Sequence, residues 1–283
     1  MDVNKALSVI LDTQGLRFFE APQLFRCIKK IESVIYFLKD MVSSSDDIVR
    51  RDYQHGRVAY AFQWNKSNHQ VLGNSTGDLA ALWAHLTTIH TGKIPEALFS
   101  DPLYTRASRL KLKTMSSAKK VGFRKQLVRS GAIVKNVDDD LVRKIRDYHR
   151  LINDLSYSAD HGILKEFLYR DPTTVAIEVP VWSDRYKVTG HIDLVRYVDG
   201  CIQVCDYKPG ALESTQRRFI DSLPQVSAYG EMMAHHLAST LRSALEAPLL
   251  PKIQCCIFDT HSSWHFDAAM FVQLYETGYL EDI

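Results

Sequence analysis

The segment GHIDLVRYVDGCIQVCDYKPG, residues 190–210, constrains the fold more than any other part of the chain. Asp199-Gly200 lies between two apolar runs, which is the strongest short-range signal of a β-hairpin. A two-residue turn there pairs Leu194 with Cys205. It also brings Asp193 opposite Asp206, where Cβ atoms lie about 4.5–5.5 Å apart. Lys208 is two residues beyond Asp206 and therefore shares its face.

Two opposed carboxylates repel each other, so the predicted pair is destabilising unless a cation lies beside it. Mg²⁺ and Mn²⁺ prefer carboxylate oxygen, and Mg²⁺ is usually held by one or two carboxylates together with water and phosphate. Such a metal activates water and polarises a phosphoryl oxygen. Lys208 would then orient the water or stabilise charge on the phosphate.

The hairpin alone leaves a second interpretation open, in which Asp193 and Lys208 form a structural ion pair. The metal hypothesis also depends on the register. A slip of one residue in the turn would move Asp193 to the opposite face of the sheet.

Apolar periodicity predicts a mostly helical first half and an α/β second half. We expect helices over 21–41, 76–92, 138–157 and 160–169. From Thr174 the period changes to two, which places Val175, Ile177, Val179 and Val181 on one strand face and Glu178 on the other. After the hairpin we expect helices over 214–223 and 224–245 that are separated or kinked at Pro224. A strand over 252–260 and a closing helix over 267–280 complete the plan.

Basic residues are concentrated between Pro102 and Val137, where ten Lys or Arg and no Asp or Glu occur. The net charge of the whole chain is only +2, so this stretch stands out. It is a candidate contact for a polyanion. A solvated helix face that pairs with acids elsewhere is the alternative interpretation.

The remaining composition argues against several classes of protein. The five cysteines form no CxxC pattern and are odd in number, which disfavours a disulfide framework or a zinc knuckle. No apolar run reaches 18 residues, so we expect no membrane-spanning helix. The N-terminal stretch is a poor signal peptide. We therefore expect an intracellular (cytoplasmic) protein with no membrane partner.

Further residues extend the hairpin into an ordered set. Gln225 and Tyr229 are spaced i, i+4 after Pro224 and project together from a helix. The set comprises Glu178 in IEVPV, Asp193 in GHIDLV, Asp206 and Lys208 in DYK, and Gln225 with Tyr229 in QVSAY. In this order the motifs resemble the RecB-like branch of the PD-(D/E)xK nuclease superfamily. The resemblance covers residues 155–260, and the first 150 residues resemble no family.

The resemblance implies a restriction-endonuclease-like α/β core with a mixed central sheet flanked by helices, preceded by a largely helical N-terminal region. Residues 1–155 would form the helical region that engages DNA. Residues 156–283 would form the nuclease core, within one continuous globular unit.

The resemblance also implies roles for the motif residues. Asp193 and Asp206 would bind Mg²⁺ or Mn²⁺ together with the backbone carbonyl of Tyr207. Lys208 would position water, and Glu178 would lie at the edge of the site. Gln225 and Tyr229 would contact the DNA strand or brace the site.

A histidine in an upstream helix is usual in this branch, and His161 is the candidate ligand. The alternatives are His149 and no histidine ligand at all. Related iron–sulfur proteins use three late cysteines, whereas only Cys255 and Cys256 occur late here. We therefore expect no iron–sulfur cluster.

The expected activity is that of a metal-dependent DNA exonuclease that prefers single-stranded ends and serves DNA repair or recombination. A homo-oligomer or a recombination or replication protein would be its partner. The alternatives are a structure-specific endonuclease of the same fold, a catalytically silent nucleic-acid-binding module, and a non-nuclease with a structural Asp–Lys pair. Cationic residues that would line a DNA groove are Arg106, Arg109, Lys111, Lys113, Lys119, Lys120, Arg124 and Lys125.

Overall fold

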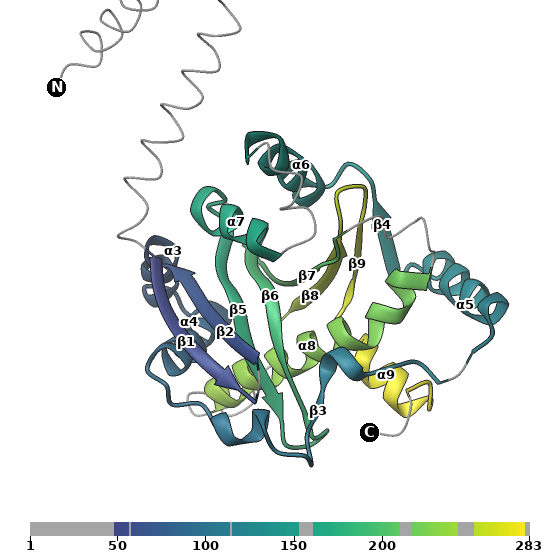
Figure 1. Cartoon of the computed structure of the whole chain (residues 1–283), viewed down its shortest axis with the longest axis horizontal. Helices are drawn as coiled ribbons and strands as arrows, with labels where there is room; N and C mark the ends of the chain where they lie inside the picture. The colour runs from purple at the N-terminus through teal and green to yellow at the C-terminus, as the bar shows by residue number, and fades with distance from the viewer. Residues whose placement is uncertain are drawn as a thin grey trace, which may run out of the picture. The chain divides into compact units, whose positions relative to one another are not determined.

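The computed structural model describes residues 48–56, 58–113, 115–152, 161–209, 217–242 and 252–280, which all fall within the unit Asp46–Ile283. These residues form a nine-stranded sheet with helices packed against it (Figure 1). The strands are β1 (Ile48–His55), β2 (Val58–Asn65), β3 (Thr105–Arg106), β4 (Ile133–Asn136), β5 (Thr174–Ser183), β6 (Val188–Val198), β7 (Cys201–Tyr207), β8 (Ile253–Phe258) and β9 (Ser263–Asp267).

The described helices are interspersed with these strands along the chain. The α-helices are α3 (Lys66–Gly73), α4 (Asp78–His90), α5 (Ser117–Arg129), α6 (Asp140–Ile152), α7 (Leu164–Arg170), α8 (Arg217–Arg242) and α9 (Met270–Glu276). Three short 3₁₀ helices join them: η2 (Glu96–Phe99), η3 (Ala107–Arg109) and η5 (His161–Ile163).

The sheet is mixed, with the strand order β1-β2-β5-β6-β7-β8-β9-β4, and β3 pairs with β6 beside this path. β7 and β8 are parallel, as are β3 and β6, whereas the other neighbouring strands are antiparallel. A parallel pair needs a crossover connection, and α8 lies in the connection between β7 and β8. The predicted fold class, a mixed central sheet flanked by helices, is confirmed.

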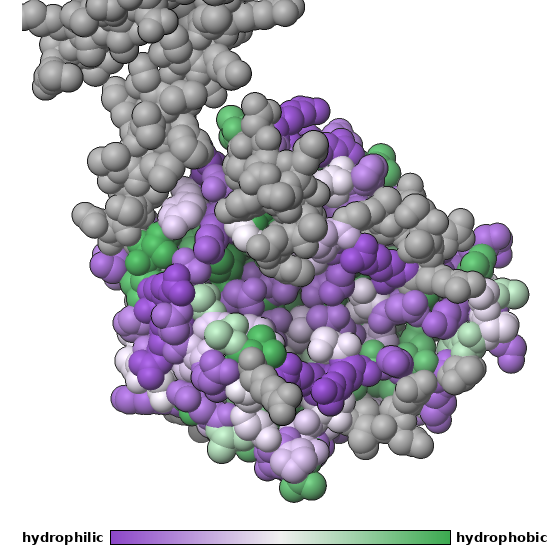
Figure 2. All heavy atoms as spheres, viewed as in Figure 1, coloured by the Kyte–Doolittle hydropathy of each residue, from purple (hydrophilic) through white to green (hydrophobic). Residues whose placement is uncertain are grey.

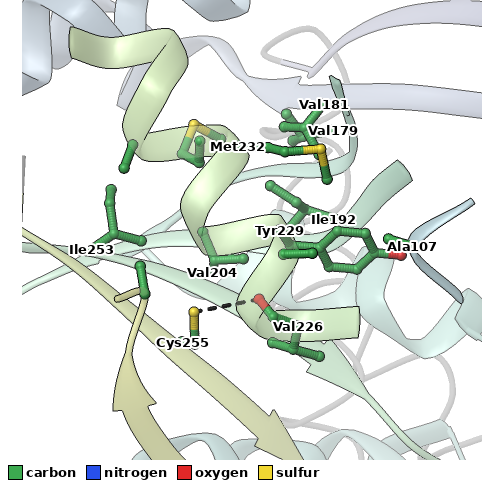
Figure 3. Packing of buried hydrophobic residues seen from close by; sticks show 14 of the residues in the cluster. Ala107, Val179, Val181, Ile192, Val204, Val226, Tyr229, Met232, Ile253 and Cys255 are labelled. Atoms are coloured by element: carbon green, nitrogen blue, oxygen red, sulfur yellow. Dashed lines mark hydrogen bonds between the residues drawn. The ribbon is translucent and has the colours of Figure 1, made fainter. Parts of the chain in front are cut away.

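Apolar residues fill two clusters that hold different helices against the sheet. The larger cluster packs α4, α8 and α9 against residues such as Val179, Ile192 and Val204. Figure 3 shows Tyr229, Val226 and Met232 of α8 within it. The second cluster packs α6 and α7 against another set of strand residues, including Leu194 and Tyr207. Because the apolar side chains of these strands are buried in the two clusters, the polar side chains on the same strands remain available to form a functional site.

The hairpin has the register that the sequence predicts. Leu194 pairs with Cys205, and the following pairs continue to Val198 with Cys201. Asp199 and Gly200 both have positive φ, 49° and 77°, as a type I′ turn requires. Continuing this register by one residue beyond Leu194 and Cys205 brings Asp193 opposite Asp206, at the open end of the hairpin.

Strands occur before residue 155 where the sequence analysis expects mainly helices. β1 to β4 all belong to the same sheet as the later strands. Polar and charged residues such as Arg50, Asp52 and Gln63 interrupt the apolar alternation of β1 and β2, which hides their strand character. The proposed DNA-engaging role of residues 1–155 stays a prediction, and the expected helix over 21–41 lies outside the described residues.

Pro224 does not separate two helices, so this alternative of the sequence analysis is wrong, whereas a kink at Pro224 stays a prediction. α8 continues from Arg217 to Arg242 with Pro224 inside it. Burial of α8 against the sheet outweighs the loss of one backbone hydrogen bond at proline. The other expected elements that fall on described residues appear as α4, α6, α7, β5, β8 and α9, with bounds shifted by a few residues.

Candidate active site

Asp206 and Lys208, at the end of β7, join Gln225 and Tyr229 of α8 in one chain of polar contacts. Lys208 Nζ lies 2.7 Å from Asp206 Oδ2, and this carboxylate is only 1% exposed. Gln225 Nε2 donates to Asp206 Oδ1 at 3.2 Å and to the Tyr229 hydroxyl at 2.9 Å. Lys208 Nζ donates to Gln225 Oε1 at 3.2 Å. The amide of Gln225 therefore fixes the acid, the lysine and the phenol together.

One carboxylate on each of the three neighbouring strands β5, β6 and β7 lies opposite the carboxylate of the next strand, so that the three form a row across the sheet. Glu178 falls between the pairs Ile177–Leu194 and Val179–Ile192, so it lies opposite Asp193. Asp193 in turn precedes the pair Leu194–Cys205 and lies opposite Asp206. Asp193 Oδ2 also accepts a hydrogen bond from the backbone N–H of Tyr207 at 2.9 Å. The row therefore contains the predicted pair, Asp193 and Asp206, and a third acid, Glu178.

The strand β5 is distorted where it contributes its acid. Glu178 has φ 53°, which is uncommon for a residue other than glycine. The regular alternation breaks at this point: Ile177 packs in the cluster of α6 and α7, whereas Val179 and Val181 pack in the cluster of α8. The expectation that Val175, Ile177, Val179 and Val181 share one face is therefore wrong for Ile177, whereas the other three pack in the same cluster. Strained backbone of this kind is concentrated at functional sites.

The acids, the lysine and the α8 pair line one cavity of about 300 Å³. Its lining joins strands β1, β2, β3, β5, β6 and β7 with η2, η3 and α8. The lining residues are His55, Tyr60, Phe99, Arg106, Ala107, Ser108, Glu178, Thr189, Gly190, His191, Asp193, Asp206, Lys208, Gln225 and Tyr229. All six motif side chains that the sequence singles out meet here.

Gly190, the glycine of the GHID motif, makes room for Tyr229. A Cβ atom on Gly190 would lie 2.3 Å from Tyr229 Cε1 and 3.3 Å from the Cβ of Ala107. Figure 3 shows the Tyr229 ring beside Ala107. The bare backbone of β6 therefore allows the phenol of α8 to reach the carboxylate row.

Burial and charge set the protonation of the central groups. Burial alone would lower the pKa of Lys208, but the carboxylates of Asp206 and Asp193 outweigh it and raise the pKa. Burial raises the pKa of Tyr229 well above its usual value, and the same two carboxylates add to this effect. At neutral pH the site therefore holds an ammonium and a neutral phenol.

The histidines fall in different places. The side chain of His161 lies outside the described structure, so its predicted role as a metal ligand stays a prediction. His149 is on α6, where its Nε2 lies 3.3 Å from the Tyr207 hydroxyl, and it is not among the cavity residues. His191 lines the cavity and lies 2.7 Å from His55, Nε2 to Nδ1.

The residues predicted to line a DNA groove are divided by the structure. Arg106 lines the cavity itself. Lys120 pairs with Asp221 at 2.6 Å, and the guanidinium of Arg124 lies over the Trp264 ring. Figure 2 shows hydrophilic residues over much of the visible surface around α5 and α6. The remaining candidates are solvent-exposed: Arg109, Lys111, Lys113, Lys119 and Lys125.

The donor set of the cavity fits a hard divalent cation. Like charges directly across neighbouring strands are destabilising, and a divalent cation between the carboxylates would offset that repulsion. No group of three or more His, Cys, Asp or Glu converges as a metal cage among the described residues. Two carboxylates with a backbone carbonyl, water and phosphate oxygen suit Mg²⁺ or Mn²⁺. Asp193, Asp206 and the carbonyl of Tyr207 are the candidates to hold it.

Four cysteines are described, and all are free thiols. Cys205, Cys255 and Cys256 are buried, and burial raises the pKa of Cys255 and Cys256 well above that of a free thiol. Cys27 lies outside the described residues. The three buried thiols act as small apolar side chains in the core.

The sequence analysis missed one side of the cavity. His55, Tyr60 and Phe99 belong to β1, β2 and η2, far from the motifs in sequence. The turn at Gly56, flanked by the Tyr and His residues of β1 and β2, is the only local signal that would have indicated this hairpin.

A mixed sheet that presents a carboxylate row and a lysine in one cavity is suited to metal-assisted hydrolysis of phosphodiesters. Residues 123–253 match the family model of the PD-(D/E)XK nuclease superfamily. The resemblance seen in the motifs is thus confirmed at the level of the superfamily for residues 123–253. The RecB-like branch stays a prediction.

No curated protein matches the chain. Among the described helices, none combines the length and apolar character needed to cross a bilayer.

Proposed function

We propose that the protein is a metal-dependent DNA exonuclease that acts on single-stranded ends. The observation that carries the proposal is the contact chain of Asp206, Lys208, Gln225 and Tyr229 beside Asp193 and Glu178 in one cavity. Membership of the matched residues in a nuclease superfamily supports the same chemistry.

Each side chain has a task that follows from its contacts. A bound Mg²⁺ or Mn²⁺ would supply a more acidic water and polarise a phosphoryl oxygen. The protonated Lys208 stabilises negative charge on the phosphate or orients the attacking water. Gln225 holds Asp206 and Lys208 in place, and Tyr229 holds Gln225. Glu178 adds a carboxylate at the rim of the cavity.

Arg106 supports a nucleic-acid substrate. Its guanidinium lines the cavity on the side of the β1–β2 hairpin, and arginine binds phosphate oxygens with well-defined geometry. The exposed cations from Arg109 to Lys125 would contact the DNA backbone further away and contribute affinity that falls with salt.

The size of the cavity supports action on a single strand. A volume of about 300 Å³ is at the small end of ligand-binding clefts. A base pair with both backbones needs more room than one nucleotide. A structure-specific endonuclease of the same fold is the second candidate, because the acids alone serve either activity.

End-labelled single- and double-stranded DNA with Mg²⁺, Mn²⁺ or EDTA tests the proposal directly. We expect stepwise shortening of the labelled single strand with metal and none with EDTA. Circular single-stranded DNA should stay intact. Cleavage of the circle would instead identify an endonuclease.

Asp206→Asn tests the site itself. The change keeps the shape but removes a charge that holds Lys208, so hydrolysis should fall by roughly 100-fold or more. Mn²⁺ should raise the melting temperature of the wild type and not that of the variant. Asp138→Asn, at an exposed carboxylate paired with Arg143, is the matched control and should behave as wild type. Full hydrolysis by Asp206→Asn would refute the proposal.

A further inference from the structure

Four rings form the cavity wall that faces the carboxylate row. Tyr60 stacks on His191 with ring centroids 3.5 Å apart and planes 9° from parallel. His55 stacks on Phe99 at 4.0 Å and 18°. The hydrogen bond between His55 and His191 ties the two stacks together at 2.7 Å. Residues from β1, β2, η2 and β6 therefore make one continuous ring surface, which we name the ring wall.

The ring wall is built with a polar group that lacks a partner. His55 is 1% exposed, and its Nε2 has no hydrogen-bond partner among the described residues. A buried polar atom of this kind is rare without a ligand or water to satisfy it. His55 lines the cavity, and a polar group bound there is one way to satisfy this nitrogen.

A cation lies at the edge of the ring wall. Arg106 donates from Nη2 to the backbone carbonyl of His55 at 3.0 Å, which fixes the guanidinium beside the rings. Among the described residues no carboxylate lies within ion-pair distance of Arg106. The guanidinium and the rings are thus adjacent to each other and face the same cavity as the acids.

A flat apolar surface with a cation at its edge matches one nucleotide. Bases stack on aromatic rings whatever their sequence, and arginine binds the phosphate. Tyr60 is only half-buried, although its ring packs on His191. A base could therefore continue the stack. A paired base inside a duplex has both faces against its neighbours, whereas an unpaired base has a face free to stack here.

We propose that the ring wall and Arg106 form a subsite for one unpaired nucleotide next to the scissile phosphate. Tyr60 and His191 take the base, and Arg106 takes its phosphate. The subsite makes an unpaired strand end the substrate class of this enzyme. The inference rests on the proposed function for its place in catalysis. His55, Tyr60, Phe99 and Arg106 nonetheless lie outside the residues that match the superfamily, 123–253.

An abasic scan tests the subsite. Single-stranded DNA oligonucleotides that carry one abasic residue at successive positions from the end are compared with the intact strand. Binding is measured by fluorescence anisotropy in EDTA, and hydrolysis is measured with Mn²⁺. One position should show weaker binding and lower kcat/KM, by about tenfold to hundredfold, because one stacked base is lost.

Tyr60 variants connect that position to the ring wall. Tyr60→Ala should bind the intact strand as weakly as wild type binds the abasic one, and should show no further loss with the abasic strand. Tyr60→Phe keeps the ring and should match wild type. The non-additive pattern is the signature of direct contact. Melting temperatures of both variants control for folding.

Arg106→Gln separates phosphate from base. The variant should weaken binding of intact and abasic strands by the same factor, because both carry the phosphate. The same scan with RNA oligonucleotides tells whether the subsite takes an unpaired deoxyribonucleotide or an unpaired ribonucleotide.

The two proposals fail in different ways. Hydrolysis without any sensitive abasic position, or an equal additional loss in Tyr60→Ala on both strands, overturns the subsite and leaves the nuclease. A sensitive position in binding without hydrolysis under any metal keeps the subsite and overturns the exonuclease.

Discussion

Gly190 shows how one missing side chain determines the geometry of the site. Its backbone is covered by the Tyr229 ring, so there is no space for even a methyl group. Tyr229 in turn accepts from Gln225, which holds Asp206. A change at Gly190 is therefore transmitted through three side chains to the carboxylate row.

Gly190→Ala should displace Tyr229 and lower both stability and activity. We expect a loss of about 1–3 kcal/mol in the free energy of unfolding, since overpacking at a buried position costs that much. Hydrolysis should fall by more than the unfolded fraction explains. Urea unfolding and kcat/KM measured on the same preparation check this.

Gly122→Ala is the matched control, because no atom lies within 4 Å of the added Cβ in α5. It should stabilise the protein by roughly 0.5–1 kcal/mol through helix propensity and leave activity unchanged. Equal behaviour of the two alanine variants would contradict the packing role of Gly190.

At the scale of elements, a buried ion network fixes α6 and α7 to the sheet on the side away from α8. Asp171, between α7 and β5, accepts from Arg196 of β6 at 3.1 Å and from Lys144 of α6 at 2.9 Å. Arg196 also reaches Asp140 of α6 at 2.7 Å. The side chains of Asp171 and Arg196 are almost completely buried, so water does not screen the attraction between their charges.

Asp171→Asn should destabilise the protein by about 3 kcal/mol, because it leaves the buried guanidinium of Arg196 with the half-exposed Asp140 as its remaining carboxylate contact among the described residues. Burial alone would raise the pKa of Asp171, but Arg196 and Lys144 outweigh it and lower the pKa. The stabilising charge is therefore present above the carboxyl pKa of the unfolded chain and is lost as pH falls through the lowered value. Chemical unfolding at pH 7 measures the loss.

Asp147→Asn removes an exposed partner of Arg150 and should change the stability by less than about 1 kcal/mol. If Asp171→Asn costs no more than this control, the network does not stabilise the fold.

The hairpin and its acids could be predicted because the information is local. Asp199-Gly200 determines the turn, and the turn determines which residues face each other across β6 and β7. The contact of Lys208 with Asp206, two residues before it in the chain, could not be predicted in the same way. Gln225 of α8 contacts both side chains, and α8 packs against the site only after the chain has folded.

The β1–β2 hairpin could not be predicted for a related reason. Its strands join the sheet through only two pairs with β5, Gln63–Ile177 and Trp64–Ala176. These partners are more than a hundred residues apart in sequence, so the apolar periodicity within a short segment does not predict their pairing. The left-handed backbone of Glu178 is likewise imposed by its surroundings, since glutamate has no preference for it.

At the scale of the whole described unit, α4, β5 and α8 meet around a buried histidine, His85, and a half-buried one, His236. His85 and His236 stack with centroids 4.6 Å apart. His236 Nε2 accepts from the backbone N–H of Trp182 at 3.2 Å, so this nitrogen is unprotonated. Burial lowers the pKa of His236 to about 4, and burial together with His236 lowers that of His85. Both rings are neutral in the folded protein at pH 7.

The fold should therefore lose stability in mild acid. An unfolded histidine takes up its proton near pH 6.5, whereas His236 resists protonation until about pH 4. The unfolded chain binds more protons in this window, so stability falls as pH decreases through it. Each such histidine contributes a loss on the order of 1 kcal/mol between pH 7 and 5.5.

His236→Gln keeps an acceptor for Trp182 but does not titrate. Its unfolding free energy should fall less steeply with pH than that of wild type, measured by urea unfolding between pH 7.5 and 5. Parallel curves for the two proteins would mean that His236 does not contribute.

The strand order leaves β1 and β4 as the outer strands of the described sheet. An outer strand offers unused backbone groups to any other chain, which is a route to aggregation. β1 carries the exposed ion pair of Arg50 and Asp52, 2.7 Å apart, along this border. Charge there opposes pairing between copies at high concentration. The charged border of β1 therefore disfavours edge-to-edge pairing of two described sheets along this strand, next to the hairpin that lines the cavity.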